Sequence, residues 1–176
     1  MSIQILDPRA DCITPARQYV LSAEIGDHTT LGLVNNKIVD CDRFMAHIGN
    51  NILSRFPNIK INYYDTGKIT YADQSLIDQI ASECDAAVCA IGHCGSCTAG
   101  TVKDGIALVE KGCPAVSLVT QVFWNQAELL AKSLGWPNAP RVELPYPVWG
   151  TSDSDMQEIC TSVVDEILKQ LENDQH

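Results

Sequence analysis

Apolar residues along this chain recur in two alternating patterns, a short run typical of a buried strand and then a helical spacing. The clearest unit is the continuously apolar run at 86–91, followed by a helical pattern at 98–111 that ends at Gly112. Four more units follow the same pattern, with strands at 31–34, 59–64, 115–119 and 142–144 and helices at 41–53, 73–84, 121–134 and 153–171. The pattern therefore predicts five strand and helix units.

Strands that alternate with helices predict a parallel sheet with right-handed crossovers. We expect a three-layer α/β sandwich with a five-stranded parallel sheet, either flavodoxin-like or Rossmann-like, that binds ligands at the carboxyl ends of its strands. Residues 1–28 show no clear period and predict an N-terminal arm that packs on a neighbouring subunit, in a homo-oligomer. Residues 29–176 then form a single α/β domain.

Charge and composition narrow the classes of partner. The 176 residues include 12 Lys and Arg against 22 Asp and Glu, a net charge of -10, without a basic stripe that could follow a nucleic acid backbone. We find no apolar run near the ~20 residues that a membrane helix needs, and no signal peptide pattern. These features predict a cytoplasmic protein that binds neither nucleic acid nor membrane.

The eight cysteines do not indicate a disulfide framework, because a reducing cytosol keeps structural thiols reduced. Free cysteine is among the most buried residue types. We therefore expect the scattered cysteines to be core residues; these are Cys12, Cys41, Cys84, Cys113 and Cys160.

The main candidates for reactive side chains lie in the segment Cys94-Gly95-Ser96-Cys97, between a predicted buried strand and a predicted helix. The spacing places two thiols one turn apart at a helix start, where unpaired N–H groups and the helix dipole stabilise a thiolate. His93 stands beside them as a general base or cationic partner, or as a loop residue turned to solvent. The segment predicts reactive thiols at Cys94 and Cys97.

Metal binding is the main competing interpretation of these cysteines. Cys89, Cys94 and Cys97 have the C-x4-C-x2-C spacing of plant-type iron–sulfur proteins, with Cys84 upstream. Cys89 lies inside a predicted strand and Cys84 at a helix end, so their sulfurs should point to different layers. We therefore predict no metal ligands. The chain also lacks G-x-G-x-x-G and phosphate-loop motifs, so we predict no nucleotide cofactor.

Several polar and aromatic residues near predicted strand ends are candidates for the same site. Asn36 and Lys68 could hold a substrate carboxylate, or be a turn residue and a surface residue. Asp104, in the helix that follows, is predicted to be catalytic together with Cys94, Cys97 and His93; its carboxylate could orient a partner chain or be solvated. The predicted substrate-binding set is Asn36, Lys68, Ser96, Thr98, Thr120, Tyr146 and Trp149. The last two could line an apolar pocket or pack in the core.

At these residues the sequence resembles the UGSC family, named for a selenocysteine or cysteine followed by Gly-Ser-Cys. Further matching segments are Asp7-Pro8, Leu33-Val34-Asn35-Asn36-Lys37, Cys84-Asp85-Ala86, Val102-Lys103-Asp104-Gly105, Glu110-Lys111-Gly112-Cys113-Pro114 and Leu144-Pro145-Tyr146-Pro147. The stretch 92–147 is more distantly similar to component B of glycine, sarcosine and betaine reductases. The chain departs from the family pattern at His93, where Asp is frequent, and at Tyr146, where His is usual.

The resemblance implies that Cys94 occupies the selenocysteine position and attacks the substrate, while Cys97 is its resolving thiol. The leading hypothesis is therefore a thiol-dependent oxidoreductase that performs reductive cleavage or thiol transfer on a small substrate. An external thiol reductant, such as a thioredoxin-like protein, would restore the dithiol. Two alternatives stay open: a cysteine-nucleophile hydrolase, lyase or transferase without redox cycling, and a metal- or cofactor-binding subunit of a larger complex.

Overall fold

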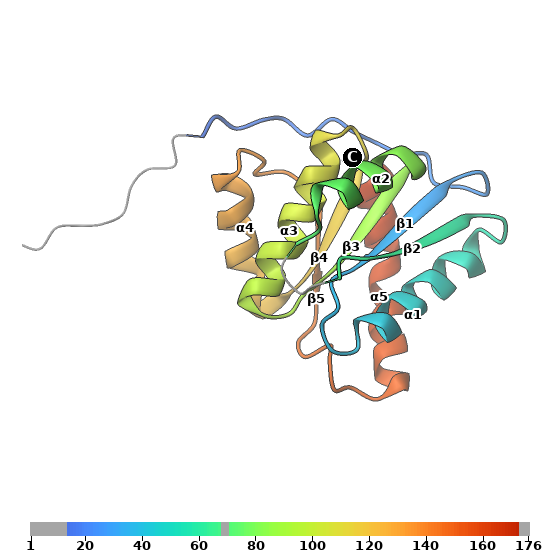
Figure 1. Ribbon diagram of the computed structural model, residues 1–176. Coiled ribbons are helices and arrows are strands. Elements are labelled where there is room, and N and C mark those ends of the chain that lie inside the picture. The colour runs from blue at the N-terminus through green and yellow to red at the C-terminus, as the bar shows by residue number, and fades with distance from the viewer. Residues whose placement is uncertain (1–13, 68–70, 173–176) are drawn as a thin grey trace, which may run out of the picture.

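The structure is a computed structural model that describes residues 14–67 and 71–172 of the chain (Figure 1). The strands are β1 (Thr30–Asn35), β2 (Lys60–Asp65), β3 (Ala86–Gly92), β4 (Ala115–Thr120) and β5 (Arg141–Leu144). The helices are α1 (Cys41–Arg55), α2 (Gln74–Glu83), α3 (Gly95–Glu110), α4 (Trp124–Ser133) and α5 (Asp153–Glu172), with a short 3-10 helix η1 (Gln121–Phe123) before α4. The five predicted strand and helix units are confirmed.

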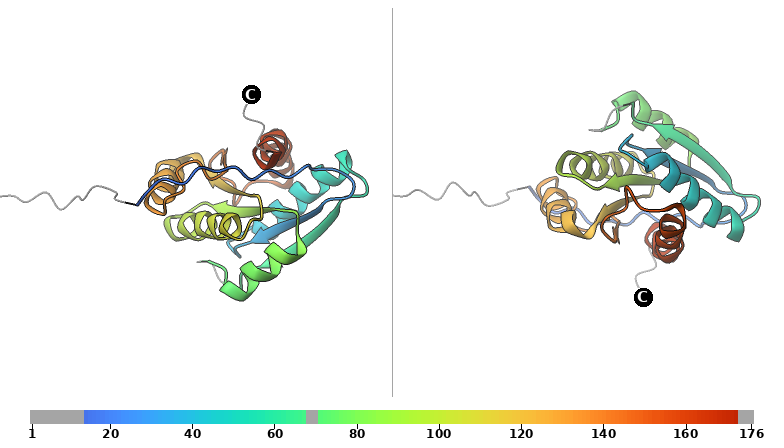
Figure 2. Two further views of the ribbon diagram at one scale, coloured as in Figure 1. Left: turned by 90° about the horizontal axis from the view of Figure 1, so that it is seen from above. Right: turned by 90° about the horizontal axis from the view of Figure 1, so that it is seen from below.

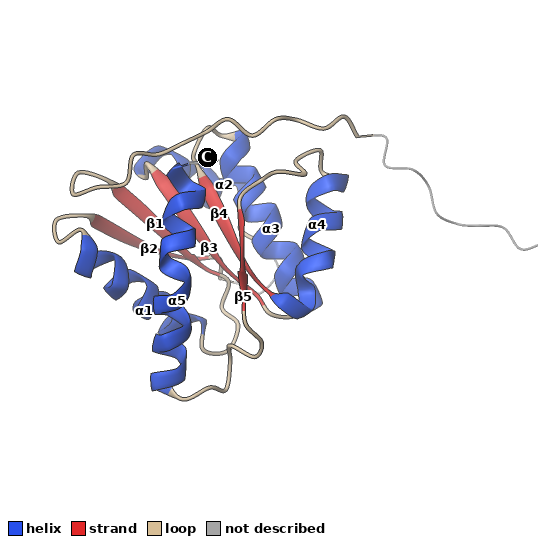
Figure 3. Cartoon of the chain, turned by 180° about the vertical axis from the view of Figure 1, so that it is seen from behind, coloured by secondary structure: helices blue, strands red, loops and turns tan. Residues whose placement is uncertain are grey.

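The five strands form one parallel sheet in the order β2-β1-β3-β4-β5. Helices α1 and α5 cover one face, and α2, α3 and α4 cover the other (Figure 3). Figure 2 shows the same layers along two further directions. This strand order is the flavodoxin-like one rather than the Rossmann order, so the first of the two predicted fold types is confirmed.

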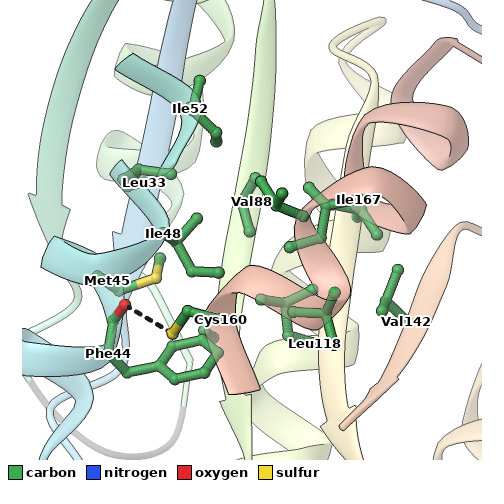
Figure 4. Packing of buried hydrophobic residues seen from close by; sticks show 14 of the residues in the cluster. Leu33, Phe44, Met45, Ile48, Ile52, Val88, Leu118, Val142, Cys160 and Ile167 are labelled. Carbon is green, nitrogen blue, oxygen red and sulfur yellow. Dashed lines mark hydrogen bonds between the residues drawn. The ribbon is translucent and has the colours of Figure 1, made fainter. Parts of the chain in front are cut away.

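The core lies on both faces of the sheet because the three central strands are buried throughout or nearly so. Every residue of β3 and β4 is buried, as a parallel strand between two helix layers requires. Between the sheet and the α1/α5 layer, Leu118 and Ile48 are fully buried, and Cys160 Sγ lies 3.6 Å from the Phe44 carbonyl oxygen (Figure 4). Burial of one such aliphatic side chain contributes about 1.5–3 kcal/mol. The core therefore holds β3 rigidly, and with it the segment that follows.

Residues 14–28, the described part of the predicted arm, run in extended form along the amino end of this chain's own sheet (Figure 1). The Arg17 N–H donates to the Gly135 carbonyl at the end of α4, and the Ala23 N–H donates to the Leu171 carbonyl of α5. Tyr19, between these two positions in the sequence, is buried in the cluster on the α2/α3 face of the sheet. The arm therefore ties two helices together at the edge opposite the carboxyl ends of the strands.

Two helix starts differ from the sequence prediction. Helix α3 begins at Gly95 rather than at residue 98, so Cys97 lies inside its first turn. Helix α4 begins at Trp124, because η1 occupies 121–123. In the described part of the chain, no helix is both long and apolar enough to cross a bilayer.

Helix α3 approaches β4 closely at Gly105. A Cβ at this position would overlap the Ser117 hydroxyl oxygen, although it would lie 3.7 Å from Ser117 Cβ. We expect Gly105→Ala to lower the free energy of unfolding by about 1–3 kcal/mol, as overpacking does. In a Ser117→Ala background the same change should be neutral or stabilising by up to about 1 kcal/mol, because alanine is the better helix former. Urea unfolding of the four proteins measures this; equal losses in both backgrounds would contradict the contact.

Candidate functional site

The two thiols of the predicted site lie where β3 passes into α3, at the carboxyl edge of the sheet. β1 and β3 are neighbours in the sheet, and the chain leaves them toward opposite faces, to α1 and to α3. Such a switch point leaves a crevice outside the strand ends, the usual ligand position in open α/β sheets. Cys94 and Cys97 lie there, joined by a disulfide with their Cα atoms 5.1 Å apart.

Cys94 is the N-cap of α3, with extended backbone angles of φ -141° and ψ 172°. Its sulfur accepts a hydrogen bond from the Cys97 backbone N–H at 3.2 Å and lies 3.5 Å from the Ser96 hydroxyl oxygen. A thiolate at this position would receive both donors in addition to the positive end of the helix dipole. After reduction, the helix start therefore stabilises the ionised form of Cys94.

The two sulfurs differ in access. Cys94 is partly exposed, whereas Cys97 is only 1% exposed and packs against the core cluster of the α1/α5 face. A bulky molecule can therefore reach Cys94 but not Cys97. This asymmetry is what a dithiol with one attacking and one resolving cysteine requires.

His93 is buried beneath the loop that follows β5. Its Nε2 accepts a hydrogen bond from the Val148 N–H at 3.0 Å, and its ring centroid lies 4.7 Å from that of Tyr146 and 4.1 Å from that of Trp149. Burial lowers the pKa of His93, so the ring is neutral. Because Nε2 is already an acceptor, this geometry gives His93 a positioning role: it holds the 146–149 loop beside Cys94.

The low pKa of His93 predicts a loss of stability in mild acid. His93 in the unfolded chain titrates near 6.5, above its pKa in the folded protein. Between the two values only the unfolded chain binds the proton, so stability is full above pH 6.5 and falls as the pH drops toward the folded pKa. We expect the urea midpoint to decrease from pH 7.5 to pH 5.5 in the wild type.

A His93→Gln variant should lose most of this decrease, because glutamine does not titrate. The carboxyl groups of Asp65, Asp78 and Glu83 have pKa values lowered from 3.8 or 4.5 by their hydrogen-bond and ion-pair partners, so they titrate below the window tested. An equal decrease in both proteins would assign the acid sensitivity to another group.

Asn36 and Thr120, two residues predicted to bind substrate, have partners inside the protein. The Asn36 Nδ2 donates to the Ile91 carbonyl at 2.9 Å and to the Thr101 hydroxyl at 3.1 Å. The Thr120 hydroxyl donates to the Gly92 carbonyl at 3.0 Å. Both side chains are at most 2% exposed. They hold the carboxyl end of β3 in place through their hydrogen bonds to its last two carbonyl groups.

Thr98 is fully buried in the first turns of α3, and its hydroxyl oxygen has no hydrogen-bond partner among the described residues. A Cβ on Gly92 would lie 3.0 Å from that oxygen, so Thr98 packs directly against the end of β3. This contact explains why the strand ends in glycine at the turn into the thiol segment. Thr98 therefore contributes to the packing under the site.

Asp104 is buried seven residues beyond Cys97 in α3, about 10 Å along the helix axis. Its Oδ1 accepts a hydrogen bond from the Ala72 N–H at 2.9 Å. The carboxylate thus anchors the connection between β2 and α2 against α3. Lys68, in the same connection, lies outside the described residues.

The remaining predicted residues are accessible beside Cys94. Ser96 is exposed, Tyr146 is 43% exposed, and Trp149 is half-buried against His93. Ser96 lies beside Cys94, and Tyr146 and Trp149 pack on the ring of His93, the residue before Cys94. These residues stay candidates for substrate contact.

One polar neighbour of the thiol segment is absent from the sequence prediction. Gln126 of α4 donates from Nε2 to the Gly95 carbonyl at 2.7 Å. The only sequence signal was indirect, since α4 follows the carboxyl end of β4 and so starts at the same edge as Cys94. Which residue of that helix would face the thiols depended on the packing of α4 against α3.

The five other described cysteines are free thiols that form no bond with the thiol pair. Cys84, Cys89 and Cys113 pack together on the α2/α3 face, whereas Cys97 packs toward α1 and α5. Within residues 14–67 and 71–172, no three side chains of His, Cys, Asp or Glu are grouped to hold a metal. Burial raises the pKa of Cys113 to about 12. Cys41 and Cys160 are also buried, and Cys12 lies outside the described residues.

The flavodoxin-like fold commonly holds a flavin at the β1/β3 switch point, where the loop after β1 would receive the flavin phosphate. Asp40 precedes α1, and Asp42 lies in its first turn. The Asp40 carboxylate accepts the Gly150 N–H at 2.7 Å, and Lys37 is already paired with Asp65 at 2.9 Å. Two carboxylates at the helix start repel a phosphate. This loop therefore does not fit a flavin phosphate.

A search of curated proteins found no match. Among solved structures, the chain is similar to a diflavin flavoprotein A3 from Nostoc sp. (13% identity, 81% of this chain and 95% of that chain, TM-score 0.43). It is also similar to a flavodoxin-like domain from Synechococcus sp. (10% identity, 80% and 99%, TM-score 0.42). The model of the UGSC family matches residues 4–173, and the chain therefore belongs to the UGSC family.

Proposed function

We propose that this protein is a thiol-dependent oxidoreductase that reduces a small substrate with Cys94 and Cys97. The observation that carries the proposal is the unequal access of two disulfide-linked sulfurs at a helix start. Cys94 is reachable and faces N–H and O–H donors, and Cys97 is buried within bonding distance of it. The five other described cysteines are buried and separate from this pair.

For a disulfide substrate the reaction has two balanced steps. The Cys94 thiolate attacks one substrate sulfur, the substrate S–S bond breaks, and the first product leaves as a thiolate that takes a proton from water. Cys97 then loses its proton to water, its thiolate attacks Cys94 Sγ to form the Cys94–Cys97 disulfide, and the second product leaves as a thiolate that takes a proton from water. Two electrons pass from the protein to the substrate, and two protons end on the products.

Activation of Cys94 in this proposal relies on the helix start rather than on a base. Cysteine is a weaker nucleophile than selenocysteine at pH 7, so its ionised form must be stabilised by its surroundings. The donors from Cys97 and Ser96 provide that stabilisation. His93 is neutral and accepts the Val148 N–H, and it keeps the 146–149 loop in place.

An external dithiol must reduce the Cys94–Cys97 disulfide to close the cycle. We assign this role to a thioredoxin-like reductant, which fits the proposed cytoplasmic location, where such proteins keep thiols reduced. The packing of a second copy against this chain, and so the homo-oligomer, stays a prediction.

The proposal is tested by reducing the protein, removing the reductant and adding glutathione disulfide as the probe. We expect each protein molecule to release two glutathione thiols and to regain the Cys94–Cys97 disulfide, as peptide mass spectrometry would show. Cys94→Ser should release none, and Cys113→Ser should behave as the wild type. Equal thiol release by Cys94→Ser and the wild type would overturn the proposal.

A further inference from the structure

We infer that Gln126 is a positioning residue for the Cys94 thiolate, acting through the peptide that joins Gly95 to Ser96. The inference rests on the proposed thiol chemistry and adds a residue outside the Cys-Gly-Ser-Cys segment. Gln126 lies in another helix, 31 residues further along the chain, and donates to the Gly95 carbonyl at 2.7 Å.

The side chain of Gln126 lies along Gly95. Its Nε2 binds the carbonyl oxygen, and its Oε1 lies 3.7 Å from the position that a Cβ on Gly95 would take. Gln126 is half-buried, and the next residue, Ala127, is fully buried where α4 packs against α3. The packing of α4 on α3 therefore fixes the position of the Gln126 carboxamide against Gly95, the first residue of α3.

The hydrogen bond acts on the donors that surround the thiolate. The Gly95 carbonyl and the Ser96 N–H belong to one peptide group, so a donor on the carbonyl makes the N–H a stronger donor. That N–H is one of the groups without an intrahelical partner in the first turn of α3, the same turn whose Cys97 N–H donates to the N-cap sulfur of Cys94. Gln126 thus strengthens the positive end of the helix where the thiolate forms.

The same bond also restrains the backbone. Gly95 follows the attacking cysteine directly, and glycine has the largest conformational freedom of any residue. Gln126 holds Gly95 in the helical conformation that directs the Cys97 N–H at Cys94 Sγ. Loss of this restraint weakens the interactions of Cys94 Sγ with the Cys97 N–H and with the Ser96 hydroxyl together.

The titratable side chains that contact the thiol segment in the described part of the chain include Cys97, which is bonded to Cys94, and Tyr146, which stacks on the neutral His93 ring. The Gln126 carboxamide does not titrate. Its removal therefore changes the reactivity of Cys94 without removing a charge.

The test compares Gln126→Leu and Gln126→Glu with the wild type and with Asn125→Leu, an exposed neighbour in the same helix. Each reduced protein is treated with iodoacetamide from pH 5 to pH 9, and alkylation of Cys94 is followed by peptide mass spectrometry. We expect the midpoint of the Cys94 pH profile to rise and alkylation at pH 7 to slow about threefold in Gln126→Leu. Gln126→Glu should slow about tenfold, because its carboxylate opposes the thiolate.

A glutathione redox titration and a melting temperature separate positioning from folding. The equilibrium should shift toward the disulfide by the same factors, about 30 mV for a tenfold change, while the melting temperature of Gln126→Leu stays near that of Asn125→Leu. If wild-type Cys94 is alkylated rapidly but both Gln126 variants have the same pH profile as Asn125→Leu, the inference about Gln126 is wrong. The proposed function is then unaffected. Wild-type Cys94 that reacts no faster than in urea-unfolded protein would overturn the proposed function as well.

Discussion

Cys97→Ser protein is expected to accumulate one glutathione on Cys94 when it is treated with glutathione disulfide, whereas wild-type protein releases it. The buried Cys97 sulfur is bonded to Cys94, so in the wild type the resolving attack is intramolecular and fast. Serine cannot make that attack, and the adduct must wait for an external thiol. We expect the adduct to persist at least ~100-fold longer in the variant, given the high effective concentration of a neighbouring group. Intact-protein mass spectrometry over time measures it.

The matched control is Cys160→Ser, which removes a buried free thiol whose Sγ lies 3.6 Å from the Phe44 carbonyl oxygen. It should release glutathione at the wild-type rate. If Cys97→Ser releases glutathione as fast as the wild type, Cys97 is not the resolving thiol. Cys94 would then act alone, as in the hydrolase, lyase or transferase alternative.

Local patterns sufficed to predict the fold class. The apolar run at 86–91 is entirely buried in β3, and the helical spacing after it is α3, because both depend on which residues face the core over a few turns. The choice between flavodoxin-like and Rossmann-like order could not be made in this way. The strand order depends on which two strands lie beside β1. In this structure they are β2 and β3.

The candidate site, like the fold, could be predicted from the sequence only where local sequence determines the structure. The thiol pair could be located because a helix start follows directly from the sequence around Cys94 and Cys97. The position of His93 under Val148 could not, since the two residues are 55 positions apart and meet only when the loop after β5 folds back. Gln126 was missed for the same reason. Tertiary contacts, rather than local propensity, decide which polar neighbours reach the thiols.

Asn36→Leu is expected to lower the free energy of unfolding by about 2–4 kcal/mol, more than a change at a ligand-contact position would. Asn36 is 2% exposed, and its amide donates to the Ile91 carbonyl and the Thr101 hydroxyl. Leucine fills a similar volume but leaves the Ile91 carbonyl without this donor in the interior. The urea midpoint measures the loss, with Asn50→Leu, at an exposed position of α1, as the control expected to change little.

Substrate kinetics then distinguish the two roles of Asn36. A side chain that supports the end of β3 from below affects the reactive thiol through the position of Cys94, so the variant should lower the rate of thiol release with little change in the KM for glutathione disulfide. A side chain that binds a substrate carboxylate would give the opposite result, with unchanged stability and a raised KM. Since the Asn36 amide is committed to Ile91 and Thr101, we expect the first pattern.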